Sequence, residues 1–224
     1  MIRKLIRSLL ARQPQTLSSV EAYAKWAQTY PPRAHNVLMQ LEEQTLSFLL
    51  PVLQDKIVLD LGGGTGRYGT IAENESACQV ISLDNSYEML RANKLRGRIQ
   101  ASSESIPLSA ESVDVVICGL ALGHLEHIGR SMNEIARVLK PDGRAIISDF
   151  HPFVALSGGQ RTFKADGMTY AVEHYIHLYS DYHNAAHIAG LDIDTVLEPT
   201  LKSDVQDMPS NMPMVLVMRL RRSG

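Results

Sequence analysis

The sequence predicts an α/β fold built on a doubly wound, mostly parallel sheet of seven strands. Between residues 57 and 148, short β-prone apolar runs alternate with segments of helical periodicity. This order favours parallel strands joined by right-handed crossovers. A glycine cluster at residues 62–66 directly follows the first run. A strand, a glycine-rich turn and a helix in succession are typical of a site for a nucleotide-like cofactor.

The composition is that of an ordinary globular protein. The 224 residues are 45% hydrophobic and 21% charged, with a formal net charge of -2, which argues against a large nucleic-acid interface. The two cysteines, Cys78 and Cys118, form no CxxC pair, so we expect a reducing, cytoplasmic location and no metal site. No apolar run reaches the roughly 18 residues of a membrane span.

The first 50 residues are predicted to form a helical cap. In residues 1–12, apolar residues recur at helical spacing with arginine and lysine between them. Two interpretations stay open: a first helix packed on the body, or peripheral contact with a membrane surface. Residues 20–50 are expected to be helical with a break at Pro31 and Pro32. Tyr23, Trp26 and Tyr30 share one helical face, which favours core packing, with ligand contact as the alternative.

The central segment supplies five of the predicted strands. After the strand at residues 57–61, the glycine turn leads into a helix from Arg67. The remaining elements are strands at residues 79–84, 98–101, 113–118 and 145–148, and helices at residues 86–96 and 128–139. Pro141, Asp142 and Gly143 form a turn signal after the last helix.

The pattern changes after His151. Residues 153–179 combine glycines with alternating polar and aromatic residues, which predicts an inserted hairpin or lid. The alternation is read as a strand, with only one of its two faces toward the crevice; its members are Tyr170, His174, Tyr175, His177 and Tyr179. A helix at residues 180–189 ends at Gly190, and closing strands are predicted at residues 191–197 and 213–220.

These elements predict a single domain with four parts. They are a helical cap (1–50), a cofactor-binding core (51–152), a lid insertion (153–179) and a closing helix with strands (180–224). Ligands of such sheets bind at the carboxyl ends of the strands. Asp60, Asp84, Ser102 and Leu120 all lie at the ends of predicted strands or just beyond them, so we expect them to converge on one crevice.

The glycine cluster alone fits two kinds of cofactor. Gly64, Gly66 and Gly69 satisfy the G-x-G-x-x-G pattern of dinucleotide sites. In that pattern the first glycine follows the strand directly, whereas here Gly62 stands in that place. Asp60 would also bring a carboxylate near a pyrophosphate, where like charges repel. A cofactor that carries a cationic amine fits this acid better.

Five segments, in order from residue 57 to about residue 150, resemble motifs of the class I S-adenosylmethionine-dependent methyltransferases. They are VLDLGGGTG at residues 58–66, SLDNSYEML at 82–90, ASSESIPL at 101–108, VDVV at 113–116 with the following residues to Leu125, and RVLKPDGR at 137–144. The flanks resemble the small-molecule branch of that family. The resemblance implies a Rossmann-like methyltransferase fold and S-adenosylmethionine as cofactor, with S-adenosylhomocysteine as product.

The resemblance also implies a set of site residues. In the family, the acid at the position of Asp84 binds the ribose hydroxyls, and the apolar residue that follows covers the adenine. Ser102 stands where the family usually has aspartate. The expected cofactor-binding residues are Tyr30, Asp60, Gly62, Gly63, Gly64, Gly66, Asp84, Asn85, Met89, Ser102, Ser103, Glu104 and Leu120. The expected substrate-binding residues are Tyr23, Tyr175, His177 and Tyr179.

His124 and His151 are the candidate catalytic residues, because both follow strands that should end at the crevice. A base is needed only if the acceptor must lose a proton, and a packing or capping role is the alternative for each. The expected reaction is methyl transfer to an oxygen, carbon or nitrogen atom of a small, partly apolar molecule. A nicotinamide-dependent oxidoreductase and a non-catalytic S-adenosylmethionine-binding module stay open as alternatives.

Overall fold

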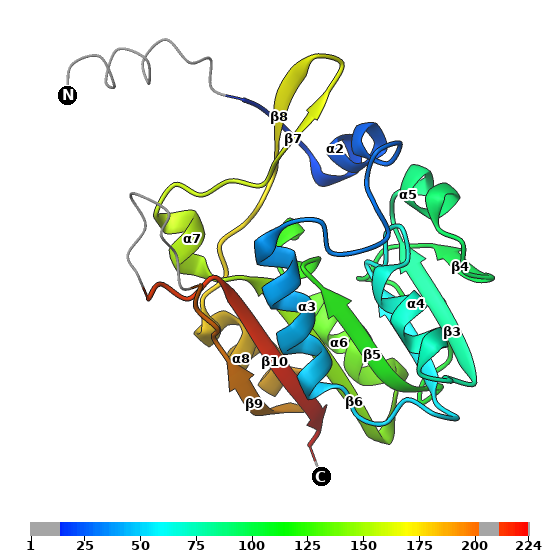
Figure 1. Ribbon diagram of the computed structural model, residues 1–224. Coiled ribbons are helices and arrows are strands. Elements are labelled where there is room, and N and C mark those ends of the chain that lie inside the picture. The colour runs from blue at the N-terminus through cyan, green and yellow to red at the C-terminus, as the bar shows by residue number, and fades with distance from the viewer. Residues whose placement is uncertain (1–13, 202–210, 224) are drawn as a thin grey trace.

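The computed structural model describes residues 14–201 and 211–223, and these residues contain a seven-stranded, mostly parallel sheet (Figure 1). Its strand order is β4-β3-β2-β5-β6-β10-β9, and only β10 runs antiparallel to its neighbours. The strands are β2 (Ile57–Leu61), β3 (Gln79–Asp84), β4 (Gly97–Gln100), β5 (Val113–Gly119), β6 (Leu139–Phe150), β9 (Leu191–Leu197) and β10 (Val215–Arg222). The predicted fold class is confirmed.

Helices cover both faces of this sheet, as the nearly continuous burial along the central strands requires. On one face, α3 (Val37–Leu49) and α4 (Arg67–Asn74) pack through Leu46 and Tyr68. On the other face, α6 (Gly129–Val138) and α8 (Tyr179–Ile188) pack through Ile135 and Tyr182. The two clusters use successive residues of the central strands, so the centre of the sheet is buried between the helical layers.

Helix α5 (Tyr87–Ala92) is shorter than expected. The sequence predicts a helix to residue 96, but the chain leaves the helix at Asn93. The Asn93 amide donates to the Ser82 hydroxyl at 2.9 Å and to the Gly64 carbonyl at 3.1 Å, and its oxygen accepts from the Leu95 amide at 2.9 Å. These bonds tie the end of α5 to the glycine turn, and local periodicity does not reveal them.

The turn signal after α6 appears as a bulge inside β6. Val113 pairs with Leu139 and Val115 pairs with Arg144, so five steps on β6 face two steps on β5. The extra residues 140–143 loop out of the ladder. Lys140 bonds Asp114 of β5 at 2.9 Å across the bulge. The sequence predicts a turn at residues 141–143 between the helix and a strand at residues 145–148. In the structure, β6 begins at Leu139, directly after α6.

A second, three-stranded sheet stands beyond one end of the main sheet (Figure 1). Its order is β1 (Gln15–Leu17), β8 (Met168–Val172), β7 (Thr162–Ala165), and β1 was not predicted from the sequence. The β7–β8 hairpin turns at Asp166 (φ 51°) and Gly167 (φ 74°), as a tight hairpin turn requires. The hairpin predicted within residues 153–179 is confirmed.

The hairpin packs on α2 (Ser19–Trp26) through stacked aromatic rings. The ring centroids of Trp26 and Phe163 lie 4.8 Å apart and those of Phe163 and Tyr170 lie 5.6 Å apart. The expectation of one strand reaching Tyr179 is wrong, because β8 ends at Val172 and Tyr179 begins α8. Two short helical elements, η1 (Leu122–His124) and α7 (Pro152–Leu156), follow β5 and β6.

The predicted basic helix at residues 1–12 lies outside the described residues. Among the residues that are described, every helix is too short or too polar to cross a lipid bilayer.

Candidate active site

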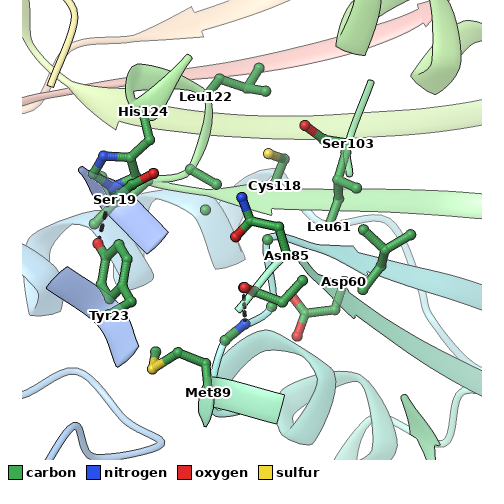
Figure 2. Close-up of a pocket in the computed structure, with 18 of the residues that line it drawn as sticks. Ser19, Tyr23, Asp60, Leu61, Asn85, Met89, Ser103, Cys118, Leu122 and His124 are labelled. Carbon is green, nitrogen blue, oxygen red and sulfur yellow. Dashed lines mark hydrogen bonds between the residues drawn. The ribbon is translucent and has the colours of Figure 1, made fainter. Parts of the chain in front are cut away.

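A pocket opens at the carboxyl ends of β2, β3 and β5, below α2 and the hairpin. It contains about 950 Å³ of empty space, part of it continuous with solvent. In Figure 2, Tyr23 and His124 lie together at one side of this pocket, and Asp60 and Leu61 lie at the other. The carboxyl ends of parallel strands are where ligands of open α/β sheets bind, so the sheet topology itself positions the pocket.

The first four residues of the glycine turn (residues 62–66) form the floor of the pocket. Gly62, Gly64 and Gly66 have φ angles of 68°, 52° and 90°, a region that residues with a side chain rarely adopt. A Cβ atom at Gly62 would also lie 2.5 Å from the Ala121 Cβ. The turn can therefore hold this shape only with glycine, and its backbone lies bare against the pocket.

The amides of the glycine turn are mostly bonded within the protein. In the structure, the Gly62 and Gly63 amides donate to the Leu83 carbonyl at 2.8 and 3.1 Å, and the Gly66 amide donates to Gly63 at 2.8 Å. The Gly64 amide donates to Asp84. These four amides are already bonded, so the turn offers a ligand its carbonyl groups and close approach instead.

Asp84, the last residue of β3, faces the glycine turn. Its Oδ2 accepts from the Gly64 amide at 2.8 Å and its Oδ1 accepts from the Ser86 amide at 2.8 Å. Burial raises the pKa of this carboxyl, and hydrogen bonds from the Ser86, Gly64 and Asn85 amides lower it. No lysine, arginine or histidine of the described residues lies within ion-pair distance of it. Asp84 is thus a pocket carboxylate without a cationic partner.

Asp60, in β2, lies deeper, beneath the turn. It is 1% exposed, and its Oδ2 accepts from the Gly69 amide of α4 at 3.0 Å. Burial raises the pKa of Asp60 to about 7, against the Gly69 hydrogen bond and the charge of Arg67, which both lower it. The carboxyl therefore fixes α4 on the sheet and borders the pocket at the same time.

One wall of the pocket contains a closed ion-pair network, here called the α3–α4 network. Arg67 donates to Glu42 at 2.7 Å and to Glu43 at 3.3 Å. Glu42 is fully buried and also accepts from the Tyr68 hydroxyl at 2.6 Å and the Ser148 hydroxyl at 2.5 Å. Every charge in this network has a partner, as buried charges normally do.

The hairpin side of the pocket carries a different group, the hairpin cluster of Tyr23, His124 and Arg161. The Tyr23 hydroxyl lies 3.0 Å from His124 Nε2, and Arg161 Nη1 bonds the same hydroxyl and lies 3.1 Å from Nε2. His124 Nδ1 lies 2.8 Å from the Glu173 carbonyl. Since a carbonyl only accepts, Nδ1 carries the proton and Nε2 is the acceptor.

Two residues of the hairpin cluster are held neutral. Burial, followed by the charge of Arg161, lowers the pKa of His124 to about 3. Burial also raises the pKa of Tyr23 to about 12, although the charge of Arg161 opposes this shift. A histidine with so low a pKa is a weak proton acceptor at neutral pH. The arrangement argues against His124 as a general base.

The structure brings most of the expected cofactor residues to the pocket. The ones that line it are Tyr30, Asp60, Gly62, Gly63, Gly64, Asp84, Asn85, Met89, Ser103 and Leu120, together with Tyr23 and His124. Ser102, Glu104 and Gly66 do not line it. The Ser102 hydroxyl accepts from the Glu104 amide at 3.1 Å, and Gly66 is the residue before α4.

The remaining expected residues lie elsewhere. His151 caps α7, where its Nδ1 accepts from the Phe153 amide at 3.3 Å, and its Nε2 lies 3.2 Å from Glu198. His177 bonds the Leu125 carbonyl at 2.8 Å. The expected substrate residues Tyr175, His177 and Tyr179 are all absent from the pocket lining, because the chain leaves the strand conformation after Val172.

Sequence reasoning missed several lining residues, of which Arg67 and Arg161 are charged. Arg67 begins the helix after the glycine turn, and that position could have indicated it. Arg161 lies in an irregular segment before β7, with no periodicity or motif around it. Only the folding of the hairpin over the pocket brings Arg161 to Tyr23 and His124.

Comparison with known proteins places this geometry in context. Residues 59–147 match the family model described as "Methyltransferase domain". The chain is 33% identical over 101 residues to the malonyl-[acyl-carrier protein] O-methyltransferase of Methylococcus capsulatus, which covers 42% of this chain and 37% of that protein. It is 38% identical over 102 residues to the ubiquinone/menaquinone biosynthesis C-methyltransferase of Syntrophotalea carbinolica, which covers 42% of this chain and 43% of that protein.

These matches span less than half the length of the two curated relatives. A solved structure gives wider coverage. The crystal structure of a putative S-adenosylmethionine dependent methyltransferase from Listeria monocytogenes superposes with a TM-score of 0.69 at 25% identity. It covers 83% of this chain and 99% of the Listeria chain.

Proposed function

Because this chain belongs to the class I S-adenosylmethionine-dependent methyltransferases, we propose that it transfers a methyl group to an oxygen, carbon or nitrogen atom of a small, partly apolar acceptor. The family membership disfavours the nicotinamide alternative. The proposal rests above all on one observation: Asp84, a pocket carboxylate with no cationic partner, lies against the bare backbone of the glycine turn.

The residues present fit the cofactor of the family. An ionised carboxylate accepts about four hydrogen bonds. Asp84 accepts from the Gly64 and Ser86 amides at 2.8 Å, and the Asn85 amide also acts on it. The carboxylate keeps acceptor capacity on its pocket side, toward a ribose. Met89 lies against Gly64 and presents an apolar surface for a purine ring. The Gly62 carbonyl receives no hydrogen bond from the described residues, which suits an ammonium group.

S-adenosylmethionine, when bound, supplies a methyl group on a cationic sulfur. The chain then has to position the acceptor and keep water out, because positioning and desolvation are the main protein contributions to such a displacement. Helix α2, through Ser19 and Tyr23, and Arg161, which precedes β7, border the pocket on the side of His124. His124 holds Tyr23 in place from one ring nitrogen and is itself held by Glu173 through the other.

The lining near the hairpin cluster supports a partly apolar acceptor. Leu120, Leu122 and Leu125 border the pocket there, next to the ring of Tyr23. Such a wall suits a molecule with an apolar body and a few polar groups. The curated relatives are named for different acceptors, one for an O-methyl transfer and one for a C-methyl transfer, so they support the reaction class rather than a particular acceptor.

Calorimetric titration of the full chain with S-adenosylhomocysteine tests the proposal. We expect binding by the wild type and a loss of about 100-fold for Asp84→Ala, since two bonds to a charged group contribute at least about 1.5 kcal/mol each. Glu88→Gln is the matched control, because Glu88 is an exposed acid on α5, four residues away. A wild-type chain that binds neither S-adenosylhomocysteine nor S-adenosylmethionine would overturn the proposal.

Turnover separates the enzyme from the non-catalytic alternative. Transfer of a radioactive methyl group to any member of a broad acceptor panel supports the enzyme. Intact cofactor binding with no transfer to any of them supports a binding module instead. Thermal shift with NAD in place of S-adenosylhomocysteine completes the comparison, and we expect no shift.

A further inference from the structure

Arg161 is a half-buried arginine without a carboxylate partner. Its guanidinium lines the pocket, and among residues 14–201 and 211–223 no aspartate or glutamate lies within ion-pair distance of it. Its neighbours are the Phe150 ring, whose centroid lies 4.4 Å from Cζ, and the neutral Tyr23 and His124. Cations that are withdrawn from water are normally paired, and Arg161 is withdrawn in part, so the missing counter-charge needs an explanation.

Among the described residues, Asp149 is the carboxylate whose charge acts most strongly on Arg161, but its oxygens accept hydrogen bonds from other residues. Its Oδ2 accepts from the Tyr182 hydroxyl at 2.5 Å, and its Oδ1 accepts from the Phe150 amide at 2.7 Å. It therefore lowers the cost of burying Arg161 only from a distance. The charge of the guanidinium stays available to a ligand in the pocket.

The hydrogen bonds of Arg161 leave one edge of the guanidinium free. All recorded contacts come from Nη1, to the Tyr23 hydroxyl, to His124 Nε2 and to the Leu120 carbonyl at 3.4 Å. Nε and Nη2 have no partner among the described residues. Among the described residues, His174 Nδ1 is the single side-chain nitrogen or oxygen atom that is both buried and without a hydrogen-bond partner. Nε and Nη2 of Arg161 have no partner, so they are accessible to solvent. The Nε–Nη2 edge is the side of arginine that a carboxylate binds with two parallel bonds.

We propose that Arg161 binds a carboxylate of the acceptor molecule on this free edge, with Tyr23 and His124 holding the guanidinium from the Nη1 side. The inference rests on the proposed function and narrows its substrate class to acceptors that carry a carboxylate. The carboxylate acts as an anchor. It positions the rest of the acceptor in the pocket, and no bond to it is made or broken by Arg161.

The surroundings favour a monoanion over phosphate. One guanidinium supplies a single positive charge, and its partners Tyr23 and His124 add none. Asp84 and Asp60 lie in the same pocket, so a second negative charge on the ligand would meet repulsion. A planar carboxylate matches both the charge and the fork geometry of arginine.

The cofactor's own amino-acid part is a second source of a carboxylate, and the first experiment separates the two sources. The full chain and its Arg161→Gln variant are titrated with S-adenosylhomocysteine and with 5′-methylthioadenosine, which lacks the amino-acid part. We expect each ligand to bind both proteins within about threefold. A tenfold or larger loss that affects S-adenosylhomocysteine but not 5′-methylthioadenosine would assign Arg161 to the cofactor and overturn the proposal.

The second experiment titrates hexanoate and benzoate, each beside its neutral amide, into the chain with and without saturating S-adenosylhomocysteine. We expect the acids to bind the wild type, the amides to bind at least about tenfold more weakly, and Arg161→Gln to remove the difference between acid and amide. Lys164→Gln is the control, because Lys164 is exposed on β7 of the same hairpin. Tyr23→Phe keeps the cation and tests its positioning, and we expect it to weaken the acids less than Arg161→Gln does.

Several results would overturn the proposal. They are equal binding of acid and amide, tighter binding of inorganic phosphate than of either acid, and no binding of either acid. Unfolding curves verify that Arg161→Gln is folded, and Arg161→Lys, which keeps the charge but not the fork, should bind the acids with intermediate affinity. Failure of the wild type to bind S-adenosylhomocysteine would refute the methyltransferase proposal separately, because binding of the acids is also measured without it.

Discussion

Arg67 and Arg161 line the same pocket, yet the protein provides for their charges in different ways. Arg67 belongs to the α3–α4 network and has two glutamates within 3.3 Å. Arg161 belongs to the hairpin cluster and has a tyrosine, a neutral histidine and a carbonyl. The guanidinium of Arg67 is neutralised by glutamates of the fold, whereas the guanidinium of Arg161 is held in position without a counter-charge.

The difference separates a structural cation from a recognition site. A buried ion pair is costly to break, because removal of one partner leaves the other charge unpaired. A half-buried cation without a partner, such as Arg161, already bears part of that cost and keeps an interaction for a ligand. The side of the pocket against α3 and α4 therefore contributes to stability, while the hairpin side contributes to binding at some expense of stability.

The largest expected effect comes from breaking the α3–α4 network. Glu42→Gln should lower the free energy of unfolding by about 3–5 kcal/mol, since Arg67 would keep its charge but lose its buried partner. Urea unfolding followed by circular dichroism measures the change. In contrast, Arg161→Gln should change the free energy of unfolding by less than about 1 kcal/mol, because no ion pair is lost.

Glu43→Gln serves as the control for the network. Glu43 lies 3.3 Å from Arg67, and its side chain is 32% exposed, so its loss should cost less than about 1 kcal/mol. If Arg161→Gln proves as destabilising as Glu42→Gln, the two arginines are equivalent structural groups and the contrast between the two sides of the pocket is mistaken.

An intermediate effect is expected from pH, through His124. Its pKa lies at about 3 in the folded chain against 6.5 ordinarily, so at pH values between them the unfolded chain binds a proton that the folded chain does not. Stability is complete above pH 6.5 and falls as the pH drops toward 3. Between these pH values the free energy of unfolding falls by about 1.4 kcal/mol for each unit of decrease in pH. At pH 5 the loss due to His124 is about 2 kcal/mol.

The stability difference between the wild type and His124→Asn isolates this contribution, because most other titrating groups cancel in the difference. We expect that difference to shift by about 2 kcal/mol between pH 7 and pH 5, against the wild type. His124→Gln should give the same shift. A difference that does not change with pH would show that His124 titrates normally and that the hairpin cluster is open to water.

Local patterns were sufficient to predict the sheet and the glycine floor of the pocket. The strand predicted at residues 79–84 coincides with β3 (Gln79–Asp84), and Asp84 could be placed at the pocket because it ends that strand. Glycines that need positive φ angles are also visible in the sequence. These features depend on residues close together in the chain, so periodicity and turn chemistry report them directly.

The rest of the site depends on contacts between distant segments. His151 directly follows β6, which predicts a position at the pocket, but Pro152 starts α7 at once and His151 caps that helix. Arg161 reaches the pocket because Trp26 of α2 stacks on Phe163 of β7. The sequence contains no local signal for that packing. The residue that is proposed to select the acceptor was therefore the hardest to predict.

The smallest expected effect tests whether the hairpin side is a separate unit. Gly167→Ala places a side chain at φ 74° in the hairpin turn, with no other atom within 4 Å, so its cost of about 1 kcal/mol is purely conformational. Hydrogen exchange should quicken in β7 and β8 but not in β2 or β5, because the hairpin packs with α2 in its own cluster. Gly129→Ala is the control: it also meets no atom within 4 Å, but lies in α6 without a positive φ, and should stabilise by up to about 1 kcal/mol. Faster exchange throughout the main sheet would mean that the two sides of the pocket unfold together. Substitutions at Arg161 would then destabilise the whole fold.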